Sequence, residues 1–180
     1  MSGNALAMTE LSSIAAGINT ADAMVKAAQV ELVFAQSVCP GKYICVVHGA
    51  VGEAQSALAA GIKTAGQFLV DKLFIANVDP QLCPAITMTT RVKPVKAVGV
   101  LEFFSVTAAI SAADTAVKAA QVRLIEIRTG YATGGNGFVT LTGEVGAVRA
   151  AVEAAAKAEP LLLNSVVIPK PAPQLVEKLL

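Results

Sequence analysis

The chain contains one sequence twice, and this duplication constrains its fold more than any other feature. ADAMVKAAQVEL at residues 21–32 and ADTAVKAAQVRL at residues 113–124 are identical at nine of twelve positions, with a shift of 92 residues. Further along, GKYICVVHGAVGEAQSAL (41–58) pairs with GNGFVTLTGEVGAVRAAV (135–152) at a shift of 94. Self-similarity over such a distance indicates a repeated structural unit. We therefore expect two copies of one domain, with two additional residues in a loop of the second copy.

Each copy alternates between strand and helix patterns. Apolar residues at helical spacing predict helices at about 14–28, 51–66, 106–120 and 145–158. Short apolar or alternating runs predict strands at about 6–11, VELVFA (30–35), KYICVVHG (42–49) and KLFIAN (72–77), and again at 97–104, VRLIEI (122–127), GFVTLTG (137–143) and LLLNSVV (161–167). The order β-α-β-β-α-β, present twice, predicts an α/β (α+β) fold of two tandem ferredoxin-like domains, each with an antiparallel sheet and helices on one face.

The two domains are expected at residues 1–80 and 97–180. Residues 81–96 are expected to form the linker, because the segment DPQLCPAITMTTRVKPVK (79–96) contains prolines, which interrupt regular elements.

The composition indicates burial against other subunits. Apolar residues make up 54% of the chain before glycine is counted, whereas a typical soluble domain reaches roughly 45–50% with glycine included. No apolar stretch approaches the roughly 18 residues of a membrane span, and the first residues lack the features of a signal peptide. We therefore expect a cytoplasmic oligomer without a membrane partner. A formal net charge of +1 argues against nucleic acid as a partner.

The segment SVCPGK (37–42) places a cysteine next to two residues that favour a turn. Pro40 has no amide hydrogen for a sheet, and Gly41 permits backbone angles that other residues avoid. Because strand patterns flank this segment, Cys39 is expected at the tip of a tight loop. Such a position is unusual, since free cysteine is mostly buried.

Several of these segments together resemble a known family. The two ADxxVKAAQV-type segments, the Gly-containing loops, the strand endings HGAVG and TGEVG and the terminal VIPKP (167–171) are similar to the bacterial microcompartment (BMC) shell domain, present here in tandem. The resemblance spans nearly the whole chain. It implies a structural shell protein and not an enzyme, because members of this family form flat tiles around a central pore. Tandem members form homotrimers that imitate the hexamers of single-domain members, and their partners are other microcompartment shell proteins.

Carried over to this sequence, the resemblance assigns residues to the pore and to the tile edge. The implied pore loops contain Cys39, Pro40, Gly41, Gly134 and Gly135, and the implied edge lysines are Lys26 and Lys118. From the residues alone, each lysine is equally explained by an ordinary ion pair with the aspartate four positions earlier on the helix.

SVCPGK is also similar to the first loop of tandem shell proteins of the propanediol-utilisation type. In those proteins the matching cysteine, one per subunit, holds an iron–sulfur cluster at the trimer axis. The resemblance therefore implies one [4Fe-4S] cluster per trimer, with Cys39 of three subunits as the metal ligands. It further implies either electron transfer across the shell or the insertion or repair of clusters for enclosed enzymes, with an enclosed redox enzyme as a candidate partner.

The chemistry of the residues allows such a shared site. One thiolate cannot hold a cluster, and the spacing of Cys39 and Cys45 is unlike the short cysteine runs that chelate one within a chain. A ring of three chains supplies three equivalent sulfurs, and the fourth ligand would be solvent or a small molecule. The amides of Gly41 and Lys42, and the charge of Lys42, would favour an anionic cluster.

Other interpretations of the same residues remain open. Cys39 is also consistent with a solvent-facing thiol in a metal-free pore that transports a metabolite. Cys45 is expected in the core and Cys83 as a structural thiol in the linker. A third possibility is a regulatory or enzymatic pair of ferredoxin-like domains with a ligand between the copies. The sequence offers no nucleophile–base pair or carboxylate dyad for that role.

Overall fold

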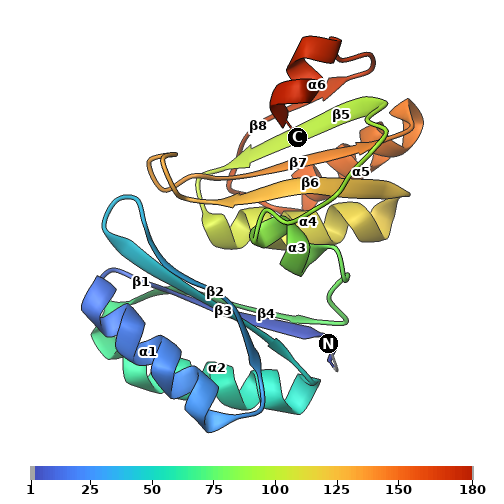
Figure 1. Cartoon of the computed structure of the whole chain (residues 1–180). Helices are drawn as coiled ribbons and strands as arrows, with labels where there is room; N and C mark the ends of the chain where they lie inside the picture. Colours follow the sequence, from blue (N-terminus) through green and yellow to red (C-terminus); the bar gives the residue numbers. More distant parts are fainter. Residues whose placement is uncertain (1–2, 180) are drawn as a thin grey trace. The chain divides into compact units, whose positions relative to one another are not determined.

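The computed structural model of the chain describes residues 3–179 (Figure 1). The chain divides into two compact units, with the main boundary between Val78 and Asp79. Each unit contains one copy of the repeat. No helix among residues 3–179 combines the length and the apolar character needed to cross a membrane.

The first unit is a four-stranded antiparallel sheet with two helices on one face (Figure 1). Its strands lie in the order β2-β3-β1-β4. In chain order the elements are β1 (Ala5–Leu11), α1 (Ile14–Ala27), β2 (Glu31–Val38), β3 (Lys42–Gly49), α2 (Val51–Ala65), the 3₁₀ turn η1 (Gly66–Phe68) and β4 (Leu69–Ala76).

The second unit repeats this arrangement, with strand order β6-β7-β5-β8. Its elements are α3 (Leu82–Ile86), β5 (Ala97–Phe103), α4 (Val106–Ala119), β6 (Val122–Thr129), β7 (Gly137–Gly143), α5 (Val145–Ala158), β8 (Leu162–Ile168) and α6 (Pro173–Leu179). All strand pairs in both sheets are antiparallel. The predicted tandem β-α-β-β-α-β fold is therefore confirmed.

The first helix of each copy begins in the same way. The side chains of Ser13 and Ser105 accept hydrogen bonds from the amides of Ala16 and Ala108, each at 3.3 Å. A serine in this position satisfies one of the amides that have no partner within the helix. The duplicated sequence thus encodes the same start for α1 and α4.

Small residues let the first helix lie close to the sheet in both copies. A Cβ atom built on Gly17 of α1 would lie 2.3 Å from the Cβ of Tyr43 on β3. In the second copy the glycine is on the strand instead, and a Cβ built on Gly137 would lie 2.7 Å from the Cβ of Ala109. Because interiors are close-packed, only one member of each pair has room for a side chain.

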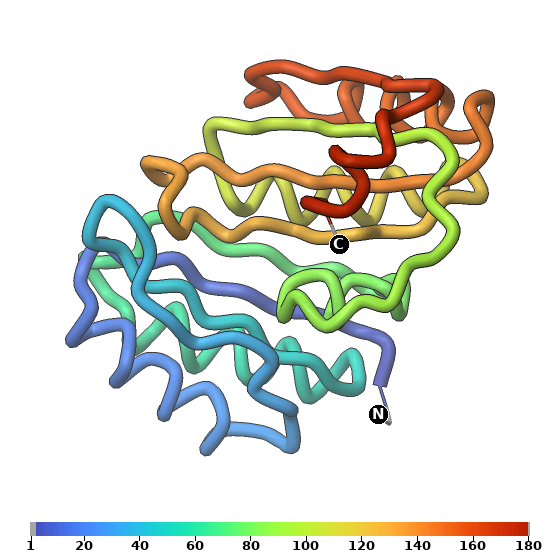
Figure 2. Tube along the Cα trace, turned by 45° about the horizontal axis from the view of Figure 1, so that its top comes forward, coloured from blue at the N-terminus to red at the C-terminus, as the bar shows by residue number. Residues whose placement is uncertain are grey.

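The segment between the two copies is a packed part of the second unit. The expectation that its prolines exclude regular structure was wrong, because α3 lies within the segment expected as the linker. Pro84 is the third residue of α3, in the first turn, where no intrahelical acceptor awaits its missing amide hydrogen. The apolar residues of this helix are buried: Leu82, Cys83, Ala85 and Ile86. Figure 2 shows this segment running beside β6.

Candidate functional site

The loop that carries Cys39 is a tight connection between two paired strands. β2 and β3 pair up to Val38 and Lys42, so that only Cys39, Pro40 and Gly41 form the turn. Gly41 has φ +77°, a left-handed conformation that favours glycine. The side chain of Cys39 is partly buried and forms no disulfide. Cys39 therefore lies at the tip of a tight loop, as the sequence predicts.

The matching loop of the second copy is longer and contains no cysteine. It connects Thr129 at the end of β6 to Gly137 at the start of β7. Four of its residues have a positive φ: Gly130, Ala132, Gly134 and Gly135. Three of the four are glycines, which adopt this conformation more readily than other residues. The two copies therefore differ in chemistry at this position, because each chain presents one loop thiol.

Lys42 is held by an ion pair that the sequence analysis did not predict. Its Nζ lies 2.7 Å from Oε1 of Glu10, whose side chain on β1 is almost completely buried. A buried carboxylate requires a partner. Glu10 is the single acidic residue in a strand of otherwise apolar or hydroxyl-bearing residues, and this pattern in the sequence could have indicated a buried ion pair. The pair reduces the positive charge that Lys42 was expected to offer an anionic cluster.

The other two cysteines lie inside the protein. Burial raises the pKa of Cys45 to about 12, so this thiol remains protonated near neutral pH. The pKa of Tyr43 is raised mainly by burial and further by Cys45. Cys83 is buried in α3. Within residues 3–179 no group of three or more His, Cys, Asp or Glu side chains could hold a metal ion.

The two lysines assigned to the tile edge occupy equivalent positions in different surroundings. Lys26 pairs with Asp22 at 2.6 Å, and both side chains are exposed. Lys118 pairs in the same way with Asp114, but Asp114 is buried and its Oδ1 also accepts a hydrogen bond from the amide of Asp79 at 3.0 Å. The segment after Val78 thus covers the aspartate in the second copy.

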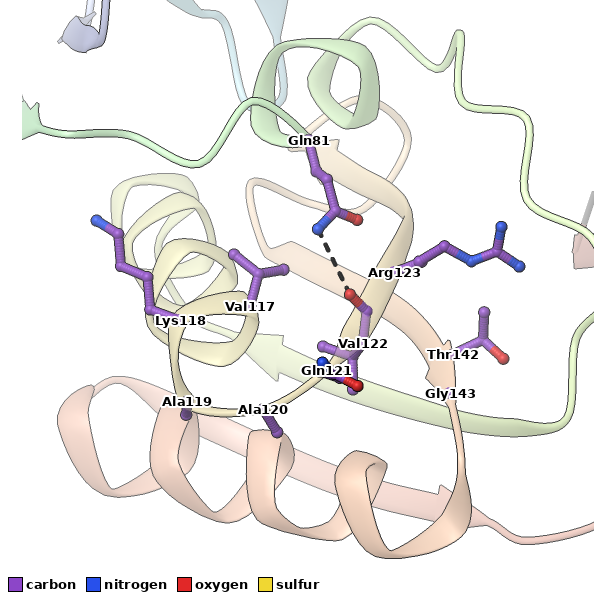
Figure 3. Close-up of a pocket in the computed structure, with 10 residues that line it drawn as sticks. All are labelled: Gln81, Val117, Lys118, Ala119, Ala120, Gln121, Val122, Arg123, Thr142 and Gly143. Atoms are coloured by element: carbon purple, nitrogen blue, oxygen red, sulfur yellow. Dashed lines mark hydrogen bonds between the residues drawn. The ribbon is translucent and has the colours of Figure 1, made fainter.

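A cavity of about 700 Å³ opens where α4 meets β6 (Figure 3). Its lining includes Lys118, Val122 and Arg123, and the side chain of Gln81 reaches across to the backbone of β6. The residues that line it form no nucleophile–base pair and no carboxylate dyad, so the cavity does not indicate a catalytic site.

The BMC-domain family model matches the chain twice, at residues 5–78 and 97–171. The chain belongs to the BMC-domain family. It is 39% identical over 170 residues to the bacterial microcompartment shell protein PduT of Citrobacter freundii, a match that covers 93% of this chain and 92% of PduT. It is 31% identical over 168 residues to the carboxysome assembly protein CcmO of a Synechocystis strain, a match that covers 84% of this chain and 55% of CcmO.

A solved structure shares the tandem BMC fold. The crystal structure of a microcompartment protein from Desulfitobacterium hafniense superposes with a TM-score of 0.92 at 45% identity, covering 96% of this chain and 98% of that protein. The family resemblance of the sequence is thereby confirmed. As a tandem BMC-domain protein related to PduT, the chain is a structural shell component and not an enzyme, and it belongs to microcompartment shells within the bacterial cytoplasm.

Proposed function

We propose that three chains form a pseudohexameric tile whose central pore binds one [4Fe-4S] cluster through Cys39 of each subunit. The tile would carry electrons across the shell. The observation that carries this proposal is the position of Cys39, a partly exposed thiol outside any disulfide, at the tip of a three-residue turn in one of two matching loops. Three chains then supply three thiols, one short of the usual four for such a cluster.

The exposed apolar face of α1 supports a ring of chains. Ile18 on α1 is 56% exposed, whereas Ile110 at the equivalent position of α4 is fully buried. Ile14 and Val106 differ in the same way. Neighbouring exposed apolar side chains on a helix indicate a surface that another protein covers. A second chain in the ring would cover this face of α1.

The turn has the features that a shared metal site requires. Cys39 supplies the thiolate, and a Cβ atom built on Gly41 would meet nothing within 4 Å, which leaves room beside the turn. In the proposed site the amide of Gly41 would hydrogen-bond to a sulfide of the cluster. When bound, a [4Fe-4S] cluster supplies one-electron chemistry. One iron would take its fourth ligand from solvent or a small molecule.

A metal-free pore for a metabolite is the second candidate function of the same tile. The ion pair between Lys42 and Glu10 favours it, because it removes a free cation that would have stabilised an anionic cluster. The two candidates share the trimer and differ only in what the pore binds.

Iron content separates the two candidates. Wild-type protein reconstituted anaerobically should contain about four iron atoms per trimer and show a broad visible absorption that bleaches on reduction. Cys39→Ala should contain none, yet should remain a trimer in sedimentation, because a loop-tip side chain buries little apolar area.

Cys45→Ala is the matched control, since it removes a cysteine from the core and should retain iron. Equal iron in wild type and Cys39→Ala would reject the cluster and leave the metal-free pore. A stable, folded monomer at micromolar concentration would reject the ring itself.

A further inference from the structure

Each copy of the domain is followed by the same short motif, which begins a helix. PQL occurs at residues 80–82 and again at 173–175, a shift of 93. The last strands of the two copies have the same shift, because β4 begins at Leu69 and β8 at Leu162. The motif therefore belongs to the duplicated unit.

The backbone around the motif is also the same in the two places. The amide of Leu82 donates to the carbonyl of Asp79 at 3.1 Å, and the amide of Leu175 donates to the carbonyl of Ala172 at 2.9 Å. α6 is thus the second copy of α3, although α3 was expected to be an irregular linker and α6 was not predicted.

In the second unit, α3 covers the free edge of the outer strand β6. The side chain of Gln81 donates from Nε2 to the carbonyl of Val122 at 3.4 Å (Figure 3). It also accepts a hydrogen bond from the amide of Leu124 at 3.0 Å. The hydroxyl of Thr90 donates to the carbonyl of Ile125 at 2.5 Å. These side chains satisfy backbone groups that a neighbouring strand would otherwise bond, which protects an exposed sheet edge.

The outer strand of the first sheet has the same shape but lacks this cover. β2 has a register shift between Leu32 and Phe34, and β6 has the matching shift between Leu124 and Glu126. However, Leu32 is 44% exposed, whereas Leu124 is 1% exposed. The adjoining aspartates differ in the same direction, because Asp22 is exposed and Asp114 is buried under Asp79.

The helix that could supply the cover is present, and most of its residues are exposed. None of the described residues of α6 is buried, and Leu175 is 41% exposed. In α3 the equivalent Leu82 is fully buried. The chain therefore contains one uncovered strand edge, that of β2, and one exposed helix, α6, which shares the PQL motif with α3.

We propose that α6 of one subunit docks on the β2 edge of the neighbouring subunit, in the way that α3 docks on β6. This inference rests on the ring assembly proposed above. By the shift of 93, Gln174 takes the place of Gln81 and bonds the carbonyl of Val30 and the amide of Leu32. The amide of Ala172 then donates to Asp22.

The apolar face of α6 fits this position. Leu175, Val176 and Leu179 stand where α3 buries Leu82, Cys83 and Ile86. Lys178 replaces Ala85, and its long side chain can carry the charge to the rim of the contact.

The order of the two copies along the chain indicates that the helix on each β2 edge comes from the neighbouring subunit. The segment after the first copy covers the sheet edge of the copy that follows it in the chain. The second copy is followed, in a closed ring, by the first copy of the next chain. A ring in which the same contact repeats head to tail then covers every β2 edge and every β6 edge alike.

Cross-linking between two introduced cysteines tests the contact. In a Cys39→Ala background, the substitutions Leu32→Cys and Gln174→Cys are combined in one chain and treated with a short bis-maleimide. The two native cysteines that remain are buried. We expect covalent dimers and trimers in denaturing gels, while each single substitution, as the matched control, stays largely monomeric.

Sedimentation of the same samples separates failure of the docking from failure of the ring. A trimer in solution that gives only uncross-linked chains overturns the docking and leaves the ring standing. A cross-linked monomer with altered mobility shows that α6 binds its own chain and overturns the assignment to a neighbour. A protein that sediments as a monomer overturns both proposals.

Discussion

At the scale of single residues, the surroundings of each cysteine decide its chemistry. Cys39 was predicted at a loop tip from the Pro-Gly pair that follows it, and the structure places it there. Cys45 was predicted in the core from its place in a strand pattern, and it is fully buried. The thiolate is the form that binds metal, so the raised pKa of Cys45 makes this thiol a poor metal ligand.

The raised pKa of Cys45 predicts a loss of stability in alkaline solution. Its pKa is about 12 in the folded chain against an ordinary value of 9.0, so the folded state holds the proton more tightly. This contribution is complete below about pH 9 and is lost as the pH rises towards 12. Between pH 8 and pH 10 the free energy of unfolding should fall by about 1.4 kcal/mol more in wild type than in Cys45→Ala.

Urea unfolding at the two pH values measures this difference. At pH 8, Cys45→Ala should be the less stable protein by about 1 kcal/mol, because it leaves a small cavity. A gap between the two proteins that stays constant with pH would show that the thiol does not titrate in this range.

At the scale of helices and strands, the duplication made most of the fold predictable. Each main element could be identified twice, and the predicted helix at 14–28 corresponds to α1 at Ile14–Ala27. α3 and α6 were missed because five and seven residues are too few to show a helical period. The Lys42–Glu10 pair and the Gln81 contacts were missed because they join residues far apart in the sequence.

The close approach of α1 to β3 predicts a strong effect of one methyl group. In Gly17→Ala the new Cβ would lie 2.3 Å from the Cβ of Tyr43, which cannot move without the strand. We expect the free energy of unfolding to fall by about 1–3 kcal/mol. Gly52→Ala on α2 is the matched control, because a Cβ there meets nothing within 4 Å. It should raise stability by up to about 1 kcal/mol.

Urea denaturation of both variants and wild type provides the comparison. If Gly17→Ala were as stable as Gly52→Ala, the helix would be free to move away from the sheet, and close packing would not explain the glycine.

At the scale of the whole molecule, the duplication lets the two copies keep one fold and take different surfaces. The loop after β2 has a thiol and the loop after β6 has glycines. The face of α1 is exposed where that of α4 is buried, and the edge of β2 is open where that of β6 is covered. A single-domain subunit would have to repeat one surface six times, whereas in the proposed trimer this chain would place three thiols at a pore lined by six loops.

The two lysines assigned to the tile edge by the family resemblance provide the last prediction, which concerns contacts between tiles. Lys26→Ala combined with Lys118→Ala should abolish extended sheets seen by electron microscopy and leave the trimer intact in sedimentation. The fold should survive, because the exposed pair of Lys26 with Asp22 contributes only a few tenths of a kcal/mol. Asp114 would keep the hydrogen bond from the amide of Asp79 after Lys118 is removed.

Lys157→Ala on α5 is the matched control for this experiment. Lys157 forms an equally exposed pair with Glu153 at 2.6 Å, and its hydrogen bond lowers the pKa of that carboxyl. The substitution therefore removes the same kind of helical ion pair from a position that is not assigned to the tile edge, and sheets should still form. Loss of the trimer in the double variant would place Lys26 and Lys118 at the contacts between subunits. Equal loss of sheets in Lys157→Ala would mean that charge, and not position, controls tiling.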